Sequence, residues 1–307
     1  MGATEVPPRR DPAATGSRAH ASPPRAKAHL NRRFDLGYGC RVTPALETAL
    51  LAAAVVAGIC WILSLITNDV SWVDRIWSLA PVGYVAWFAS RARFADARLD
   101  VMLVLAALWG ARLTYNFVRK GGYRRGGEDY RWPILRERFG PVLFQLFNAT
   151  FIAPLQNLLL LAFTLPAWAA LEHPAPLAPT DVAAALLFAG FLIGETVADQ
   201  QQWHFQQDKA QRRASQREIE HPFLTSGLFR YSRHPNFFCE MGMWWSFYLF
   251  SVAGSGWLNA TIGGVVALTA LFQGSTQMTE SLTLGKYPSY GEYQRTTSRL
   301  VPWMPRG

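Results

Sequence analysis

The sequence is poor in cysteine and contains no glycine-rich nucleotide-binding motif. Cys40, Cys60 and Cys239 are its three cysteines, and their spacing is unpaired, which favours neither a zinc site nor a disulfide framework. No G-x-G-x-x-G motif follows a strand-like segment, so a Rossmann domain is not supported. A dinucleotide, if one binds, must therefore bind among helices.

The first 41 residues lack any apolar run. They are rich in Pro, Ala, Arg and Ser, so they cannot bury a core, and we expect residues 1–41 to be disordered. A secretory signal does not fit, because no hydrophobic region occurs before Ala45. The segment is either a solvated basic tail or, since Arg is frequent and acids are few, a transit peptide.

Long apolar stretches dominate the rest of the chain. Half of the residues are hydrophobic, with 12 Trp and 19 Phe, and aromatic residues are enriched at lipid–water boundaries. A spanning helix needs roughly 20 residues, and seven stretches approach that length: 45–66, 72–90, 101–118, 148–170, 181–198, 237–252 and 257–274. The sequence therefore predicts an all-α, polytopic membrane bundle of about seven transmembrane helices, with residues 42–307 as a single domain.

The basic residues are placed as in membrane-surface loops. The net charge of +9 is compatible with nucleic-acid binding, but these residues lie between apolar runs, so we expect membrane lipids and no nucleic acid as partners. Loops 119–138 and 200–233 and the segment after Gly285 are rich in Lys and Arg, whereas 171–180 has neither. The positive-inside rule places those basic regions and the C-terminus in the cytosol. With seven spans, the basic N-terminus would lie on the opposite side of the membrane from the cytosol, which contradicts the same rule. The sequence therefore does not decide on which side the N-terminus lies.

One segment joins cationic residues to an apolar run through a proline. Residues 227–245 read GLFRYSRHPNFFCEMGMWW, and Pro235 suits the first position of a helix. His234 then falls near the N-cap. Arg230 and Arg233 lie beside the positive end of the helix dipole, and such an arrangement attracts anions.

Pairs of polar residues occur four positions apart inside the apolar segments, so each pair shares one helix face. The pairs are Arg112 and Asn116, Glu195 and Asp199, and Asn236 and Glu240. Polar groups are costly to bury in a membrane and indicate a site. For Arg112 alone, snorkelling to the interface is the other explanation.

The segment LFRYSRHPNFFCE resembles the C-terminal signature of membrane reductases of the steroid 5α-reductase and sterol reductase type, and is most similar to the DUF1295 branch of uncharacterised multi-pass proteins. Three further blocks carry the resemblance: VDRIWSLAP at 73–81, GGEDYRW at 126–132 and KYPSYGEYQRTTSRLVPWMP at 286–305. It extends from about Trp72 to the C-terminus.

The resemblance implies an NADPH-dependent reductase of a conjugated carbon–carbon double bond in a lipid- or steroid-like enone, with the cofactor site in the C-terminal half, 181–307. Steroid reductases have an Asn where this chain has Glu195, while Asp199 matches their pattern. The cofactor-binding residues implied are Arg112, Asn116, Asp129, Arg131, Glu195, Asp199, Arg230, Tyr231, Arg233, His234, Asn236 and Glu240. Glu280 also resembles an acid of the family, although helix capping explains it equally well.

The catalytic end departs from that pattern. The acid expected in the second span is at best Asp74, which could equally form a local ion pair with Arg75. Trp109 replaces the expected Tyr, and an indole N–H donates a hydrogen bond but supplies no proton. Asp74, Trp109 and Tyr130 are therefore the catalytic candidates, and the proton donor is unassigned.

Two other functions remain open. Isoprenylcysteine carboxyl methyltransferase, which uses S-adenosylmethionine, also carries an Arg-His-Pro, but it has a Tyr two residues after the Pro, where this chain has Phe237. The Asn236 and Glu240 pair fits the reductases better. A non-catalytic sterol-binding protein would explain the altered catalytic positions. The expected location is the endoplasmic reticulum in a eukaryote or the inner membrane in a bacterium.

Overall fold

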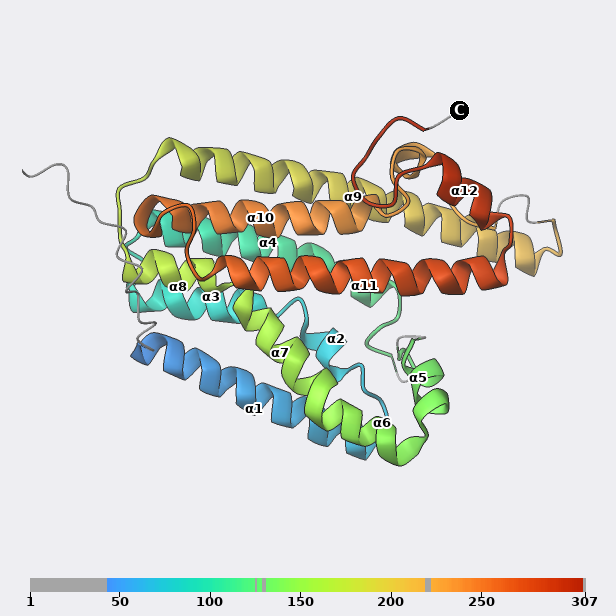
Figure 1. Ribbon diagram of the computed structural model, residues 1–307, viewed down its shortest axis with the longest axis horizontal. Helices are drawn as coiled ribbons and strands as arrows, with labels where there is room; N and C mark the ends of the chain where they lie inside the picture. Colours follow the sequence, from blue (N-terminus) through green and yellow to red (C-terminus); the bar gives the residue numbers. More distant parts are fainter. Residues whose placement is uncertain (1–42, 125, 129–130, 219–221, 306–307) are drawn as a thin grey trace, which may run out of the picture. The chain divides into compact units, whose positions relative to one another are not determined.

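The computed structural model describes residues 43–124, 126–128, 131–218 and 222–305. The predicted disordered tail, 1–41, lies outside these residues. Residues Val42–Gly307 form one compact unit, and its described part is all-helical, as predicted, with no strand (Figure 1). Its elements are α1 (Pro44–Thr67), α2 (Trp72–Ile76), α3 (Ala80–Arg91), α4 (Ala97–Arg119), α5 (Arg131–Phe139), α6 (Pro141–Phe147), the π-helix η1 (Asn148–Ile152), α7 (Ala153–Ala162), α8 (Leu165–Glu172), α9 (Pro179–Ala214), the 3₁₀ helix η2 (Gly227–Arg230), α10 (Pro235–Ser255), α11 (Ile262–Lys286) and α12 (Tyr290–Thr296).

Four helical segments in the described part of the chain are long and apolar enough to cross a membrane, which indicates an integral membrane protein. They are α1, α4, the continuous run Pro141–Ala162 and α9. The count of about seven spans is not confirmed. The predicted span 72–90 is broken into α2 and α3, because Pro81 occupies the first turn of α3 and cannot continue a preceding helix. Helices α10 and α11 have 21 and 25 residues but are not among these four segments.

Among the described residues, the most extensive helix pairing is that of α9 with α10, which lie side by side in Figure 1. Two glycines permit it. A Cβ added at Gly242 of α10 would lie 2.7 Å from the ring of Phe191, and one at Gly194 of α9 would lie 2.9 Å from the Sγ of Cys239. Small residues let helix backbones approach closely, so the acids of α9 come within reach of α10.

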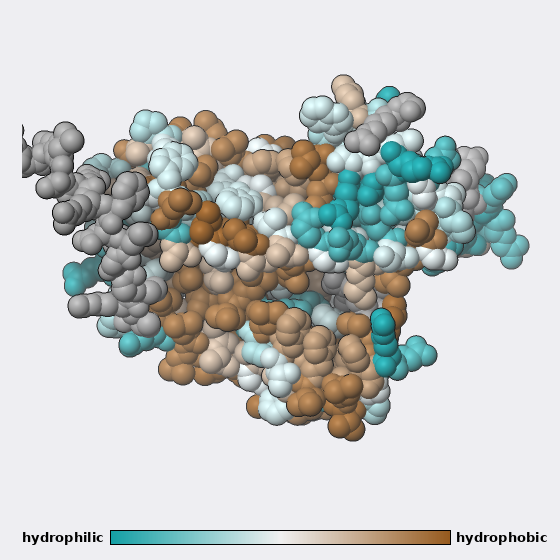
Figure 2. All heavy atoms as spheres, viewed as in Figure 1, coloured by the Kyte–Doolittle hydropathy of each residue, from teal (hydrophilic) through white to brown (hydrophobic). Residues whose placement is uncertain are grey.

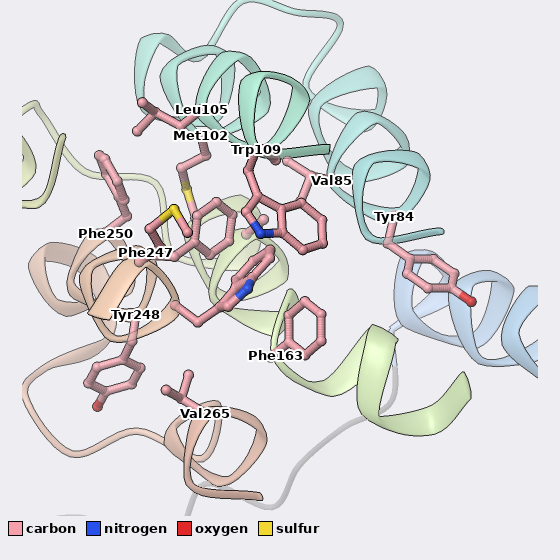
Figure 3. Close-up of a cluster of buried hydrophobic side chains, with 14 of the residues drawn as sticks. Tyr84, Val85, Met102, Leu105, Trp109, Phe163, Phe247, Tyr248, Phe250 and Val265 are labelled. Atoms are coloured by element: carbon pink, nitrogen blue, oxygen red, sulfur yellow. The ribbon is translucent and has the colours of Figure 1, made fainter. Parts of the chain in front are cut away.

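An aromatic cluster holds α4 against α10 (Figure 3). Trp109 of α4 and Trp244 of α10 are both 0% exposed, and their rings meet edge-on with centroids 4.9 Å apart. Phe163, just after α7, packs on Trp244 with centroids 4.1 Å apart. Such edge-to-face contacts add to the hydrophobic gain of burial. They fix the face of α4 that carries Arg112 opposite α9 and α10.

An ion pair fixes the N-terminal ends of α4 and α9. The Nε and Nη2 of Arg98 lie 2.7 and 2.9 Å from the two carboxylate oxygens of Asp181. Its remaining donors reach the carbonyls of Ala175 and Pro176 at 3.0 and 2.8 Å. A bidentate pair in which every guanidinium nitrogen donates has a defined geometry, so it sets the register of α4 against α9.

The segment that follows α12 packs on the residues just before α10. The backbone N–H groups of Arg233 and His234 donate to the carbonyls of Ser298 and Arg299 at 2.8 and 3.1 Å. The N–H of Trp303 donates to the carbonyl of Tyr231 at 2.9 Å. The start of α10 is therefore held by the C-terminal segment.

Candidate functional site

A buried cluster forms where α4, α9 and α10 meet, with one guanidinium facing three carboxylates. The Nη1 of Arg112 lies 2.8 Å from Glu195 Oε1 and 2.7 Å from Asp199 Oδ2. Its Nη2 lies 3.4 Å from Glu240 Oε2. The three acids are only 5 to 6% exposed. We call Arg112, Asn116, Glu195, Asp199 and Glu240 the Arg112 cluster; its acids outnumber its one cation.

Neighbouring donors on one face of α4 and on α10 complete this arrangement. Asn116, one turn beyond Arg112, donates from Nδ2 to Asp199 Oδ2 at 2.6 Å. Trp109, one turn before it, donates from Nε1 to the two oxygens of Glu240 at 2.9 and 3.0 Å. Trp244 donates to the same carboxylate at 3.1 Å. The indole N–H of the catalytic candidate Trp109 is therefore directed at Glu240.

Two buried atoms of the cluster have no hydrogen-bond partner among the described residues: the Nε of Arg112 and the Oε2 of Glu195. Leaving such a group unpaired costs about 1–3 kcal/mol, and buried polar atoms are normally satisfied. The cluster borders a cavity of about 200 Å³, the inner cavity, which is lined by Trp77, Leu113, Asn116, Phe117, Lys120, Glu195, Asp199, Asn236, Phe237, Glu240 and Phe272. Of the two residues with an unpaired atom, Glu195 lines this cavity, and an unpaired carboxylate oxygen there fits a polar ligand.

A larger cavity, the outer cavity, adjoins the inner one. Its volume is about 600 Å³, and its lining includes the cations Lys209, Arg213 and Lys286 and three tyrosines, Tyr287, Tyr290 and Tyr293. Asn236 and Phe237, at the start of α10, line both cavities. Burial raises the pKa of the Tyr290 and Tyr293 hydroxyls above their usual range, so both remain neutral at physiological pH. The paired cavities thus offer cations and hydroxyls at one end and carboxylates at the other.

Glu280 of α11 organises a second buried polar network. It accepts from Arg233 Nε and Nη2 at 2.7 and 2.9 Å, from His234 Nε2 at 3.0 Å and from Gln294 Nε2 at 3.0 Å. Burial opposes ionisation of Glu280, but the hydrogen bonds from His234 and Arg233 outweigh it and lower its pKa to about 2. We call Arg233, His234, Glu280 and Gln294 the Glu280 network.

The residues predicted to bind anions at the start of α10 fall into two groups, one bonded within the protein and one exposed. The remaining donors of Arg233, on Nη1, reach the carbonyls of Gln294 and Thr297, so its guanidinium bonds within the protein. Arg230 and Tyr231, at the end of η2, are exposed. The cations that line the outer cavity beside Arg233 and His234 come instead from α9 and α11.

The other candidates lie apart from the Arg112 cluster or outside the described residues. Asp74 of α2 accepts a hydrogen bond from Trp132 Nε1 at 3.1 Å, while Arg75 pairs with Asp69 at 2.6 Å. Asp129, Tyr130 and the side chain of Arg131 lie outside the described residues.

Lys209 belongs to the polar segment 200–217, whose charge predicts a solvated helix and for which a phosphate contact from one of its cations is the less favoured interpretation. Lys209 is 9% exposed; its ammonium donates to the carbonyl of Pro222 and lies 5.8 Å from the ring centroid of Phe205. An aromatic residue four positions before a lysine was the available signal, since the two share a helix face.

Comparison with known proteins identifies the family. A family model described as a protein of unknown function, DUF1295, matches residues 60–297. The chain belongs to the DUF1295 family. An uncharacterized protein of the fission yeast Schizosaccharomyces pombe is 37% identical to this DUF1295 protein over 269 residues, covering 82% of this chain and 78% of the relative. No solved structure matches the chain. The DUF1295 match contains both the Arg112 cluster and the Glu280 network.

Proposed function

We propose that this DUF1295 protein is an NADPH-dependent membrane reductase of a conjugated carbon–carbon double bond in a lipid- or steroid-like enone. The observation that carries the proposal is the pair of cavities that share Asn236 and Phe237. An elongated dinucleotide has phosphates that suit Lys209, Arg213 and Lys286. Its ribose hydroxyls and carboxamide are donors for the carboxylates of the Arg112 cluster.

The residues of the inner cavity suit the demands of this reaction. NADPH, when bound, supplies the hydride. Asp199 and Glu195 would hold donors of the cofactor, and Asn236, at the junction of the cavities, would orient it. Trp77 and Phe272 on the cavity wall exclude water, which strengthens electrostatic interactions inside. Negative charge that develops on the enone oxygen requires a hydrogen-bond donor beside it.

The proton donor is proposed to lie outside the Arg112 cluster. The titratable residues lining the inner cavity, within the described chain, are Lys120 and the acids Glu195, Asp199 and Glu240. These acids serve as carboxylate acceptors in this proposal, so none of them also supplies the proton. Asp74, which accepts a hydrogen bond from Trp132 Nε1, is the proposed proton donor.

A second function is favoured by one feature of the same cluster. Three carboxylates around one guanidinium leave negative charge beside the inner cavity, and a positively charged sulfonium would be stabilised there. This supports an S-adenosylmethionine-dependent methyltransferase like isoprenylcysteine carboxyl methyltransferase. The two candidates differ in the ligand that they bind, which makes them separable by titration.

The proposal also includes the orientation of the protein in the membrane and the membrane in which it resides. The basic loops and the C-terminal segment support a cytosolic position for the cofactor side and the C-terminus. The proposed membrane is the endoplasmic reticulum in a eukaryotic cell or the inner membrane in a bacterium.

Calorimetric titration of the detergent-solubilised protein with NADPH, NADH and S-adenosylmethionine tests the function. We expect saturable binding of NADPH that Asp199→Asn weakens. Asp208→Asn is the matched control, since Asp208 lies on the same helix in an exposed pair with Arg212. NADPH oxidation with a panel of sterol, steroid and fatty enones then tests turnover. Saturable binding of S-adenosylmethionine alone would establish the methyltransferase instead, and NADPH binding without turnover of any enone would favour a non-catalytic protein.

A further inference from the structure

A third cavity lies beside the C-terminal segment, separate from the inner and outer cavities except for Arg233 at its wall. Its volume is about 420 Å³, and its lining consists of Arg233, Gln294, Arg295, Thr296, Thr297, Ser298, Arg299, Trp303 and Met304. No acid is among these residues. Arginines and three hydroxyl side chains in one concave surface are the donors that proteins use for phosphate oxygens.

Two of the three arginines that line this C-terminal cavity have no acidic partner among the described residues. Within the described part of the chain, Arg295 and Arg299 form no ion pair; Arg299 donates instead to the neutral side chain of Gln273. Arg233, by contrast, is engaged by Glu280. Arg295 is exposed. Arg295, which is exposed, and Arg299, which is half-buried and bonded to a neutral amide, thus keep their positive charge for an anion.

Apolar side chains project beside these arginines. Val301, Trp303 and Met304 are 60, 71 and 72% exposed, although the backbone of Trp303 is fixed by its hydrogen bond to Tyr231. Figure 2 shows hydrophilic residues gathered over α12 and the C-terminal part of α9, next to the mostly hydrophobic surface of the spanning helices. Trp and Arg together at such a boundary are typical of the lipid headgroup region.

We propose that the C-terminal cavity binds the headgroup phosphate of an anionic phospholipid. Arg295 and Arg299 contact the phosphate, and Trp303 and Met304 lie along the apolar part of the lipid. A phospholipid fits better than a free phosphate because it uses both the cations and the exposed apolar side chains. This proposal is independent of the proposed function.

The site predicts an effect on the start of α10. Arg299 contributes its carbonyl to His234, so a lipid held by the Arg299 side chain stabilises the pairing of the C-terminal segment with the residues before α10. We therefore expect anionic lipid to raise the melting temperature of the protein.

The test compares lipid binding by Arg295→Gln and by the Arg295→Gln, Arg299→Gln double variant with that of the parent. Protein in nanodiscs of phosphatidylcholine is titrated with phosphatidylglycerol, and retained lipid is quantified by native mass spectrometry. Each arginine near a membrane surface contributes about 1 kcal/mol, hence about fivefold in affinity, so the double variant should lose about 25-fold. Arg295→Gln alone removes an exposed side chain and should fold normally.

Arg138→Gln is the matched control for the loss of one surface cation, because Arg138 is an exposed arginine on α5 outside the cavity lining; it should weaken phosphatidylglycerol binding less than Arg295→Gln does. Trp303→Ala should weaken phosphatidylglycerol binding, because it removes an exposed apolar side chain beside the arginines. Equal phosphatidylglycerol affinity in the parent and the double variant would overturn the proposal. Displacement of the lipid by inorganic phosphate at comparable concentration would also overturn it, in favour of a free-phosphate site.

Discussion

The Arg112 cluster and the Glu280 network are both buried, yet they have opposite charge balances. In the cluster, one guanidinium faces three carboxylates. In the network, one carboxylate accepts from a guanidinium, an imidazole and an amide. Unpartnered buried atoms occur in the first, on Arg112 and Glu195; within the described residues the second has none.

We expect this difference to distinguish the proposed binding site from a structural network. A fully satisfied polar network rigidifies its surroundings, whereas a partly satisfied one lacks a partner. The Glu280 network ties α11 and the residues after α12 to the start of α10. The residues of the Arg112 cluster come from α4, α9 and α10, and two of their buried atoms have no hydrogen-bond partner among the described residues. Substitutions in the two regions should therefore affect different properties.

The largest expected effect is on stability. Glu280→Ala leaves Arg233 buried without its carboxylate, and breaking a buried pair from one side costs about 3–5 kcal/mol. Thermal unfolding in detergent, followed by circular dichroism, should show a large fall in melting temperature. Glu292→Gln, an exposed acid on α12, is the control and should melt with the parent. If Glu280→Ala also melts with the parent, the network does not stabilise the fold.

The pH dependence of stability should report the same network. The pKa of Glu280 is lowered from 4.5 to about 2, so the folded protein binds the proton less tightly than the unfolded chain. The stabilisation is therefore complete above about pH 4.5 and is lost as the pH falls toward 2. Unfolding measured between these values should give a slope that is reduced in Glu280→Gln. An unchanged slope in that variant would assign the acid sensitivity to other carboxylates.

The spacing of polar residues along each helix determines which features of these two regions the sequence could predict. The i, i+4 spacing put Glu195 with Asp199 and Arg112 with Asn116, and the structure brings all four together. The same spacing of four residues placed Asn236 and Glu240 on one helix. Both line the inner cavity, because α10 packs closely on α9. Local periodicity therefore predicted the composition of the cluster.

Long-range partners could not be predicted from the same local rules. Arg233 and His234 fitted an anion site at a helix start, yet Glu280, 46 residues after His234, accepts from both. That pairing depends on how α11 and α12 pack against the start of α10, which no local pattern contains. The apolar composition of residues 72–90 predicted one span, but the helix is interrupted before α3. Pro81 is a local signal for this interruption, and the apolar pattern concealed it.

Substitution of a residue between the two cavities should weaken NADPH binding without changing the stability of the protein. Asn236→Ala removes a polar group at the junction of the two cavities, and loss of one hydrogen bond to a buried ligand costs about 1–3 kcal/mol, or roughly 5- to 150-fold in affinity. Calorimetric titration with NADPH should show this loss with a melting temperature near that of the parent. Gln277→Ala replaces an exposed amide on α11 and should bind as the parent does. Unchanged affinity in Asn236→Ala would remove this residue from the proposed site.

The smallest expected effect has the opposite sign to that of Glu280→Ala. Glu195→Gln removes one of three acids around Arg112, which keeps Asp199 and Glu240 as partners. Less repulsion among the remaining charges should stabilise the ligand-free protein by about 1 kcal/mol, within the range of substitutions that relieve a functional constraint. NADPH affinity should fall in the same variant, because Glu195 has an unused acceptor beside the inner cavity. Glu137→Gln, an exposed acid on α5, should change neither quantity. A clear loss of stability in Glu195→Gln would mean that Glu195 stabilises the fold as Glu280 does, and the contrast between the two regions would fail.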